Sequence, residues 1–179
     1  MELLDIVDEN GEPTGVVKER SLVHQDGDLH RTAHVWIIRD KADGGLEVLL
    51  QKRSQNKDSH PGCYDISSAG HIPAGDDYIE SALRELEEEL GIVAEEAELE
   101  FRESRRISYE AIFHGKPFRD NQLPHVFRLK RNDIEISKLT IQEEEVESVM
   151  WMDYEECLKA VENNTIPNCI VLEELKSIG

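Results

Sequence analysis

Residues 84–91 hold four glutamates and one arginine, a combination that an isolated helix should avoid. On a helix of 3.6 residues per turn, Glu85, Glu88 and Glu89 share an arc of about 100°. Like charges at these spacings cost a helix roughly 0.2–0.5 kcal/mol per pair, and only Arg84 offers local relief. A divalent cation would turn the repulsion into ligation, and an all-oxygen ligand set suits Mg²⁺ or Mn²⁺. A solvated acidic face is the alternative that the charges alone leave open.

The residues on either side of the cluster predict the helix that carries it. A loop at 70–75 with two glycines and a proline precedes Asp77, and Glu80 three residues later completes a capping-box pattern. Gly91 is typical of a helix C-terminal stop. Apolar residues at helical spacing predict one stripe that faces a core. They are Ile79, Ala82, Leu83, Leu86 and Leu90.

The segment from Gly70 to Ile92 resembles the Nudix box. That pattern is a glycine, five residues, a glutamate, seven residues, and then Arg-Glu-hydrophobic-x-Glu-Glu-x-Gly-hydrophobic. Eight of its nine fixed positions match, at Gly70, Arg84, Glu85, Leu86, Glu88, Glu89, Gly91 and Ile92. The exception is Asp76, which keeps the charge of the first glutamate but is one methylene shorter. In the family this position supports the junction between loop and helix.

The resemblance implies hydrolysis of a diphosphate bond in a nucleoside diphosphate-linked or similar small metabolite. It implies that Glu85, Glu88, Glu89 and the Gly70 carbonyl bind Mg²⁺, with Mn²⁺ possible, and that Arg84 fixes the glutamates by ion pairing. Such a reaction needs divalent ions because a diphosphate carries dense negative charge. The general base stays open between a box glutamate and a carboxylate from a later loop, such as 143–145.

Three further residues are candidates for contact with the substrate. Arg53 ends a predicted strand at 46–53 and could meet a phosphate, and Arg31 could do the same from a strand at 30–38. His71 lies inside the glycine loop. An ordinary structural or surface role is the open alternative for each of them.

The N-terminal half also resembles isopentenyl-diphosphate isomerase, a Nudix relative. The shared features are Leu4–Asp8, Val23-His24, Leu29-His30, 49–53 and 68–71. In that isomerase, histidines that match His24, His30 and His71 bind a metal. Whether they do so here is left open, because a lone histidine is more often a satisfied polar residue than a ligand.

The proton carriers of that isomerase are missing or doubtful in this chain. Its essential cysteine corresponds to Ala69, and its catalytic glutamate corresponds to Gln122 or Asp120. The isomerase is therefore kept only as an alternative function. A non-catalytic ligand-sensing Nudix module is a second alternative, disfavoured because such domains usually lose the box glutamates.

Composition narrows the class of protein. The 179 residues include 20 Lys plus Arg against 39 Asp plus Glu, for a net charge of −19, which argues against nucleic-acid or anionic-membrane partners. The three cysteines lack a CxxC spacing and are expected to be free thiols. No signal segment or long apolar run is visible, so a cytoplasmic protein is expected. The oligomeric state is left open.

The expected fold is a single α/β domain over 1–179, with 1–30 as a small N-terminal strand-and-turn extension. The Nudix resemblance makes this an α/β/α sandwich around a mixed β-sheet. Strands are expected at 3–8, 14–17, 30–38, 46–53, 65–69, 99–112, 125–129 and 146–152, with a loop at 116–124. Helices are expected from Asp77 to Gly91, from Asp153 to about 163, and from Pro167 to about 176.

Overall fold

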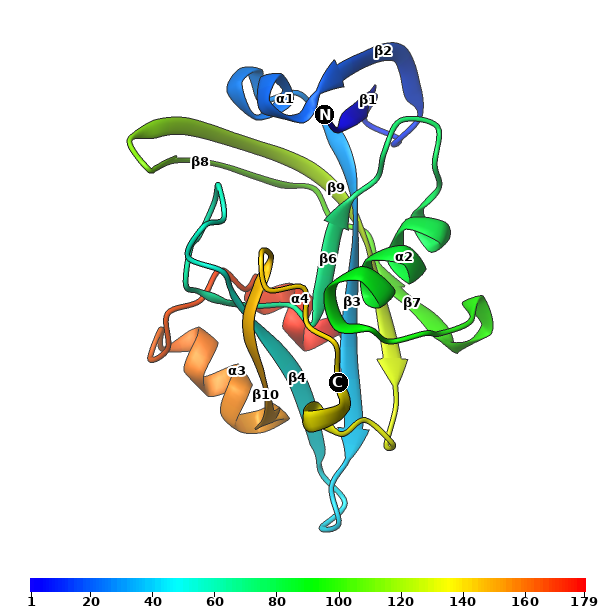
Figure 1. Ribbon diagram of the computed structural model, residues 1–179, viewed down its shortest axis with the longest axis vertical. Coiled ribbons are helices and arrows are strands. Elements are labelled where there is room, and N and C mark those ends of the chain that lie inside the picture. The colour runs from blue at the N-terminus through cyan, green and yellow to red at the C-terminus, as the bar shows by residue number, and fades with distance from the viewer.

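The structure is a computed structural model that describes all residues from 1 to 179. The chain forms ten strands and four α-helices, with the strands in runs between the helices (Figure 1). The strands are β1 (Leu3–Val7), β2 (Pro13–Glu19), β3 (His30–Asp40), β4 (Leu46–Arg53), β5 (Tyr64–Asp65), β6 (Ser68–His71), β7 (Leu99–Glu103), β8 (Ile107–Phe113), β9 (Lys116–Lys130) and β10 (Val146–Asp153). The helices are α1 (Arg20–Asp26), α2 (Tyr78–Leu90), α3 (Tyr154–Glu162) and α4 (Leu172–Ser177).

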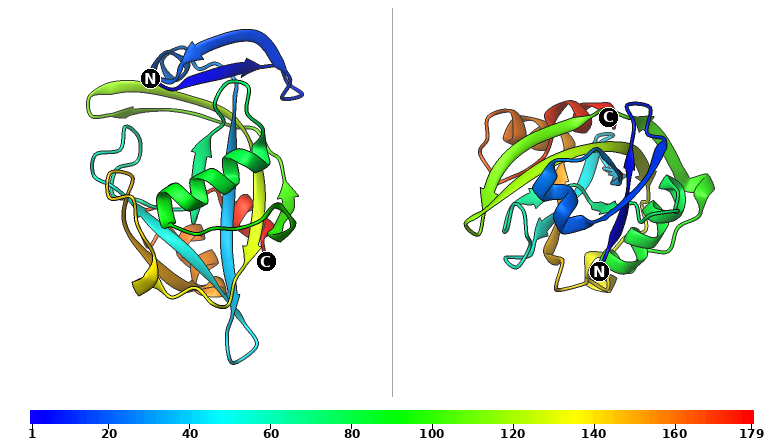
Figure 2. Two further views of the ribbon diagram at one scale, coloured as in Figure 1. Left: turned by 45° about the vertical axis from the view of Figure 1, so that its right-hand side comes forward. Right: turned by 90° about the horizontal axis from the view of Figure 1, so that it is seen from above.

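Eight of the strands form one mixed sheet, with the order β10-β4-β3-β9-β7. The short strands β5 and β6 pair with β4 and β3, and β8 pairs with β9. Strands β3 and β9 are parallel, and the other pairs are antiparallel. Strands β1 and β2 form a separate antiparallel pair, which lies with α1 across one end of the molecule (Figures 1 and 2).

Strand β3 is buried on both faces, which explains its nearly continuous apolar sequence. Ala33, Val35 and Ile37 pack on the side of α2, whereas Trp36 and Ile38 join a second core with residues of α3 and α4. The sheet therefore lies between α2 on one face and α3 with α4 on the other. This confirms the predicted α/β fold of sandwich type.

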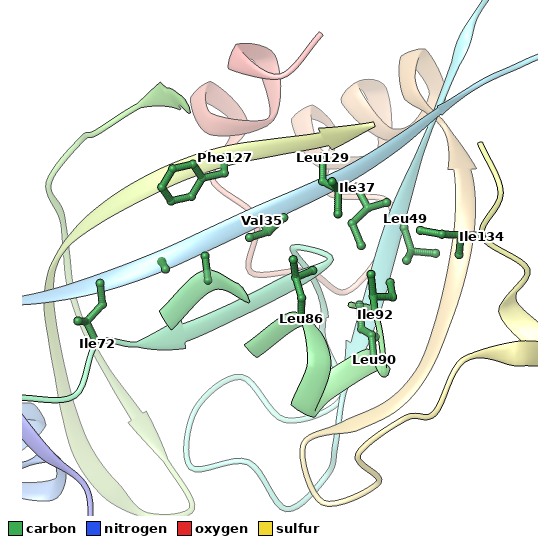
Figure 3. Close-up of a cluster of buried hydrophobic side chains, with 12 residues drawn as sticks. Val35, Ile37, Leu49, Ile72, Leu86, Leu90, Ile92, Phe127, Leu129 and Ile134 are labelled. Atoms are coloured by element: carbon green, nitrogen blue, oxygen red, sulfur yellow. The ribbon is translucent and has the colours of Figure 1, made fainter. Parts of the chain in front are cut away.

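Helix α2 forms as its sequence predicts. The Asp77 carboxylate accepts the Glu80 backbone N–H at 2.8 Å, although no reciprocal bond from the Glu80 side chain completes the box. Gly91 ends the helix at a φ of 68°, a left-handed conformation that favours glycine. Figure 3 shows Leu86 and Leu90 of this helix pointing toward β3 and β4, where they complete a core.

The segment after α2 differs from the prediction in two ways. The long strand expected at 99–112 is two strands, β7 and β8, and the loop expected at 116–124 belongs to the 15-residue strand β9. Pro117 and Pro124 suggested a loop, but Pro124 lies between the stretch of β9 paired with β8 and the stretch paired with β7. Its missing N–H removes no ladder bond at that edge, so the strand tolerates it.

Two helices were also wrongly placed or missed. The last helix begins at Leu172 and not at Pro167, because Pro167 accepts a backbone hydrogen bond from Tyr64 of β5 at 2.8 Å. Helix α1 was not anticipated. It has seven residues and no side-chain cap, and it buries only Val23 and His24, so its sequence signal is weak.

All three cysteines are free thiols, as predicted. No helix combines the length and apolar character needed to span a membrane.

A split in the sheet positions the candidate site. Strand β4 pairs with β3 only between 46–48 and 38–40, and the N-terminal half of β3 pairs instead with β6. The two long strands therefore diverge, and Gln51 of β4 bridges the gap. Its amide donates to the Ser67 carbonyl at 3.2 Å and to the Glu89 carboxylate at 2.8 Å.

The cap of α2 can be tested directly. Asp77→Ala removes the side-chain acceptor at the helix start, so it should lower the free energy of unfolding by about 1 kcal/mol. Denaturant unfolding followed by circular dichroism measures this change. Glu87→Ala on the exposed side of the same helix is a control for charge loss, and an equal effect of both substitutions would contradict a specific capping role.

Candidate active site

A cavity of about 420 Å³ opens where β4 leaves β3. Its lining comes from α1, α2, β3, β4, β6, β8, β9, α4 and the loops after β4 and before β10. Six residues predicted for the site lie along it, namely Arg53, Gly70, His71, Glu85, Glu88 and Glu89. Residues far apart in sequence thus meet around one space.

Glu85 lies directly against the backbone of β6. A Cβ at Gly70 would overlap the Glu85 side chain, so a larger residue there would displace the carboxyl group from its present position. Arg84 spans the acidic groups around it, with nitrogen-to-oxygen distances of 3.0 Å to Asp76, 3.5 Å to Glu85 and 3.9 Å to Glu88. From just before α2, Asp76 thus holds Arg84 in place, although its side chain is shorter than that of the glutamate in the family pattern.

Burial perturbs two of the three carboxyl groups. Glu89 is 5% exposed, and burial raises its pKa to about 8, with the Glu85 carboxylate adding to the shift. Burial also raises the pKa of Glu85 to about 7, against the stabilising charge of Arg84. Glu88 is the most exposed of the three, at 53% of its side chain. Groups of this kind can bind a divalent cation in exchange for protons.

Two cations lie on the side of the cavity formed by the loop after β4. Arg53 is fixed by Asp65 at 3.0 Å and by the Ser59 carbonyl at 2.9 and 3.0 Å. Lys57 is ion-paired with Glu145, and both line the cavity. Lys57 was missed from the sequence because it stands in a polar loop with no distinguishing pattern.

Two further arginines, Arg20 and Arg31, differ in their position relative to the cavity. Arg20 of α1 lines the cavity and pairs with Asp58 at 3.2 Å, although the sequence did not single it out. Arg31 does not line the cavity. Its guanidinium contacts Asp5 at 3.3 Å and the Asp76 carbonyl at 3.1 Å, so it ties β1 to the loop before α2.

Three histidines converge at one edge of the cavity. Single ring nitrogens of His24, His30 and His71 all lie within 4.8 Å of one another, and Asp120 Oδ1 is 3.7 Å from His30 Nε2 and 3.8 Å from His24 Nε2. Burial lowers the pKa of all three, to about 3 for His24, so the rings are neutral near pH 7. The Asp28 carbonyl accepts from His30 Nδ1 at 3.0 Å, which leaves Nε2 with its lone pair. The cluster has the kind of ligands that a metal site uses.

A buried polar network forms another part of the lining. Glu174 Oε1 accepts from His34 Nδ1 and from Trp36 Nε1, both at 2.9 Å. Gln122 Oε1 accepts from the Thr32 hydroxyl at 2.6 Å and lies 3.2 Å from His34 Nε2. Burial opposes a charge on His34, but the Glu174 carboxylate outweighs it and raises the pKa of the imidazole. The sequence did not single out Glu174, because its partners are 138 and 140 residues away.

The raised carboxyl pKa values predict a pH-dependent stability in the absence of divalent ions. Glu89 binds a proton in the folded protein up to about pH 8 but releases it near pH 4.5 when unfolded, so stability should fall as the pH rises between these values. Glu89→Gln should flatten this slope and raise the unfolding free energy at pH 8.5 by about 1–3 kcal/mol.

Thermal and urea unfolding in EDTA at several pH values measure this effect. Glu87→Gln, on the exposed side of the same helix, is the matched control. A wild-type stability that rises between pH 5 and pH 8, or equal slopes in both variants, would contradict the burial of Glu89 as an unpaired acid.

Comparison with known proteins agrees with the geometry. Residues 28–169 match the NUDIX domain family. The chain is 43% identical over 157 residues to Nudix hydrolase 3 of Arabidopsis thaliana, covering 87% of this chain but 20% of that protein. It is 37% identical over 163 residues to an uncharacterized Nudix hydrolase of Clostridium acetobutylicum, covering 90% of this chain and 75% of that one. A Deinococcus radiodurans crystal structure shares the fold, with a TM-score of 0.70, 18% identity and 98% coverage of both chains. The chain belongs to the Nudix hydrolases.

Proposed function

We propose that this protein hydrolyses a diphosphate bond in a nucleoside diphosphate-linked or similar small metabolite, with Mg²⁺ as its cofactor. The observation that carries the proposal is that Glu85, Glu88 and Glu89 line one cavity with Arg53 and Lys57. A volume of about 420 Å³ lies in the range of small-molecule sites. The cavity thus combines carboxylates for a metal with cations for a phosphate.

The donor set fits a hard divalent cation. The carboxylates of Glu85, Glu88 and Glu89, with the Gly70 carbonyl, are oxygen ligands of the kind that Mg²⁺ and Mn²⁺ prefer. When bound, the ion would neutralise diphosphate charge and lower the pKa of a water molecule. Arg84 would hold two of the glutamates in place through the ion pairs described above.

The other side chains of the cavity have separate parts in this proposal. Arg53 and Lys57 would bind the phosphate oxygens, since each is already held in place by an acidic partner. Glu145 lies beside Lys57 on the same lining and is a candidate for orienting the attacking water. In a chain of net charge −19, such local cations are what an anionic substrate requires.

Double-bond isomerisation is supported less well. Ala69 lines the cavity beside Gly70 and cannot carry a proton. Gln122 is a neutral amide whose nitrogen donates to Asp120 at 2.5 Å and whose oxygen accepts from Thr32. Asp120 also lines the cavity and could carry a proton, but with Ala69 in place of the cysteine the second proton carrier that transfer on carbon needs is missing. A non-catalytic sensor is disfavoured because the chain keeps all three box glutamates.

The hydrolase proposal can be tested with one substitution on α2. Glu88→Gln removes a ligand at an exposed position, so the protein should fold while hydrolysis falls at least about 100-fold. The measurement is product formation from a panel of nucleoside diphosphate derivatives with Mg²⁺ or Mn²⁺. Glu87→Gln should retain full activity. Equal activity of Glu88→Gln and wild type, or no hydrolysis of any diphosphate, would overturn the proposal.

The histidine cluster gives a second, separate prediction. If His24, His30 and His71 hold a metal, as the isomerase resemblance implies, purified protein should take up Zn²⁺ or Mn²⁺ with a stoichiometry near one in the Glu88→Gln background. His71→Gln should abolish that uptake. Equilibrium dialysis with metal analysis measures both. Unchanged uptake in His71→Gln would show that the cluster is only a packed set of neutral rings.

A further inference from the structure

Glu174 is an unusual group to find in the wall of this cavity. Glu174 lies on the short C-terminal helix α4 and is only 3% exposed. It lines the same cavity as the box glutamates. Burying a carboxylate costs several kcal/mol unless donors compensate it. The role of Glu174 can therefore be inferred from the donors that bind its carboxylate and from the oxygen that none of them binds.

Both donors of Glu174 bind the same oxygen. Trp36 Nε1–H can only donate, and it reaches Oε1 at 2.9 Å, as does His34 Nδ1. Oε2 has no hydrogen-bond partner, and it is not fully closed off from solvent. One acceptor atom of a fixed, buried carboxylate is thus open to the cavity.

The other polar groups in this part of the cavity are already satisfied. Gln122 Oε1 accepts from Thr32, and the Asp65 oxygens accept from Arg53 and from the Ile66 backbone N–H. Ile66, Ala69 and Val171 add apolar surface to this part of a lining that is mostly polar. Where the neighbouring polar groups are already paired, one free acceptor held in a fixed position can set the orientation of a bound group.

Flat side chains line another part of the same cavity. Tyr109 of β8 and Phe118 of β9 both belong to the lining, with ring planes 29° apart and centroids at 6.2 Å. His60 donates to or accepts from the Tyr109 hydroxyl at 3.0 Å, which fixes the tyrosine. Aromatic rings of this kind favour a planar ligand by stacking.

We propose that Glu174 Oε2 is a specificity-determining acceptor that selects diphosphates whose second moiety is a planar heterocycle with an N–H donor, such as an amino-bearing nucleobase. The inference rests on the proposed function, because it takes the diphosphate to lie at the α2 end of the cavity. A hydrocarbon moiety would leave the carboxylate oxygen desolvated and unpaired, so such a substrate is selected against.

A purely structural role makes a different prediction for Glu174. If it only ties α4 to β3, then glutamine would serve equally, since an amide oxygen still accepts from Trp36. Glu174→Gln keeps that bond but can present an amide N–H₂ to the cavity in place of the free acceptor. The substitution therefore separates anchoring of α4 from recognition of a donor.

The test uses matched pairs of substrates that differ in one exocyclic amino group. The probes are adenosine diphosphate with purine riboside diphosphate, guanosine diphosphate with inosine diphosphate, and isopentenyl diphosphate as a donor-free compound. Wild type should favour the amino-bearing member of at least one pair by about tenfold or more in kcat/KM. Glu174→Gln should bring that ratio close to one, while kcat/KM for the partner without the amino group changes less than about threefold.

Glu173→Gln, on the exposed side of the same helix, is the control and should keep the wild-type ratio. The wild-type ratios need no substitution, so a variant that fails to fold leaves the test intact. Wild-type ratios within about threefold of one for both pairs, a preference for isopentenyl diphosphate, or a preference that Glu174→Gln leaves unchanged would each overturn the inference.

A binding measurement separates this inference from the proposed function. Calorimetric titration of the same nucleotides into Glu88→Gln protein, at fixed Mg²⁺, measures the pair preference without turnover. If no diphosphate is hydrolysed but the amino-bearing member binds more tightly and Glu174→Gln removes the difference, the hydrolase proposal fails and the subsite stands. If diphosphates are hydrolysed with no pair preference in rate or binding, the hydrolase proposal stands and the subsite fails.

Discussion

Repulsion among the carboxylates of α2, at the border of a packed core, is the constraint around which the site is arranged. Leu86 and Leu90 fix the helix on the sheet, so the helix cannot rotate to turn the acidic side chains away from the cavity. Nearby side chains compensate part of the negative charge instead. Arg84 spans acidic groups before and along the helix, and Gln51 donates across the split in the sheet to Glu89. Burial, with a smaller contribution from the neighbouring carboxylates, still raises the pKa of Glu85 and of Glu89, and a bound cation would favour their charged forms.

The positive charges of the cavity are also compensated by nearby side chains. The chain carries a large excess of acid, yet three cations line the cavity: Arg20 from α1, and Arg53 and Lys57 from the end of β4 and the loop after it. Each is paired with a carboxylate, so none is an unpaired buried charge. An anion that enters would compete with these partners for the same donors. Attraction for the substrate is thus local, set by a few held side chains and not by the net charge of the protein.

How far the sequence predicts this structure depends on the distance over which each signal acts. Helix α2, its cap at Asp77 and its stop at Gly91 follow from short-range spacing, and they were predicted correctly. Strand β9 was misjudged because Pro124 looks like a break until its place between two partner strands is known. Glu174 could not be found, because nothing near it in sequence distinguishes it from the exposed Glu173. Its burial exists only once α4 packs on β3.

The side chains of β3 point alternately to the two faces of the sheet, and this alternation links the core under α2 to the polar groups on the opposite face. Ala33, Val35 and Ile37 face α2 and complete the core beneath the box helix. The even-numbered residues of the strand face the other side, where His30 belongs to the histidine cluster and His34 to the polar network around Glu174. A shift of one residue in the register of β3 would bury the histidines under α2 and expose the aliphatic residues to the cavity. The core packing that holds α2 therefore also sets the order of polar groups along the opposite face, from the histidine cluster to the carboxylate of α4.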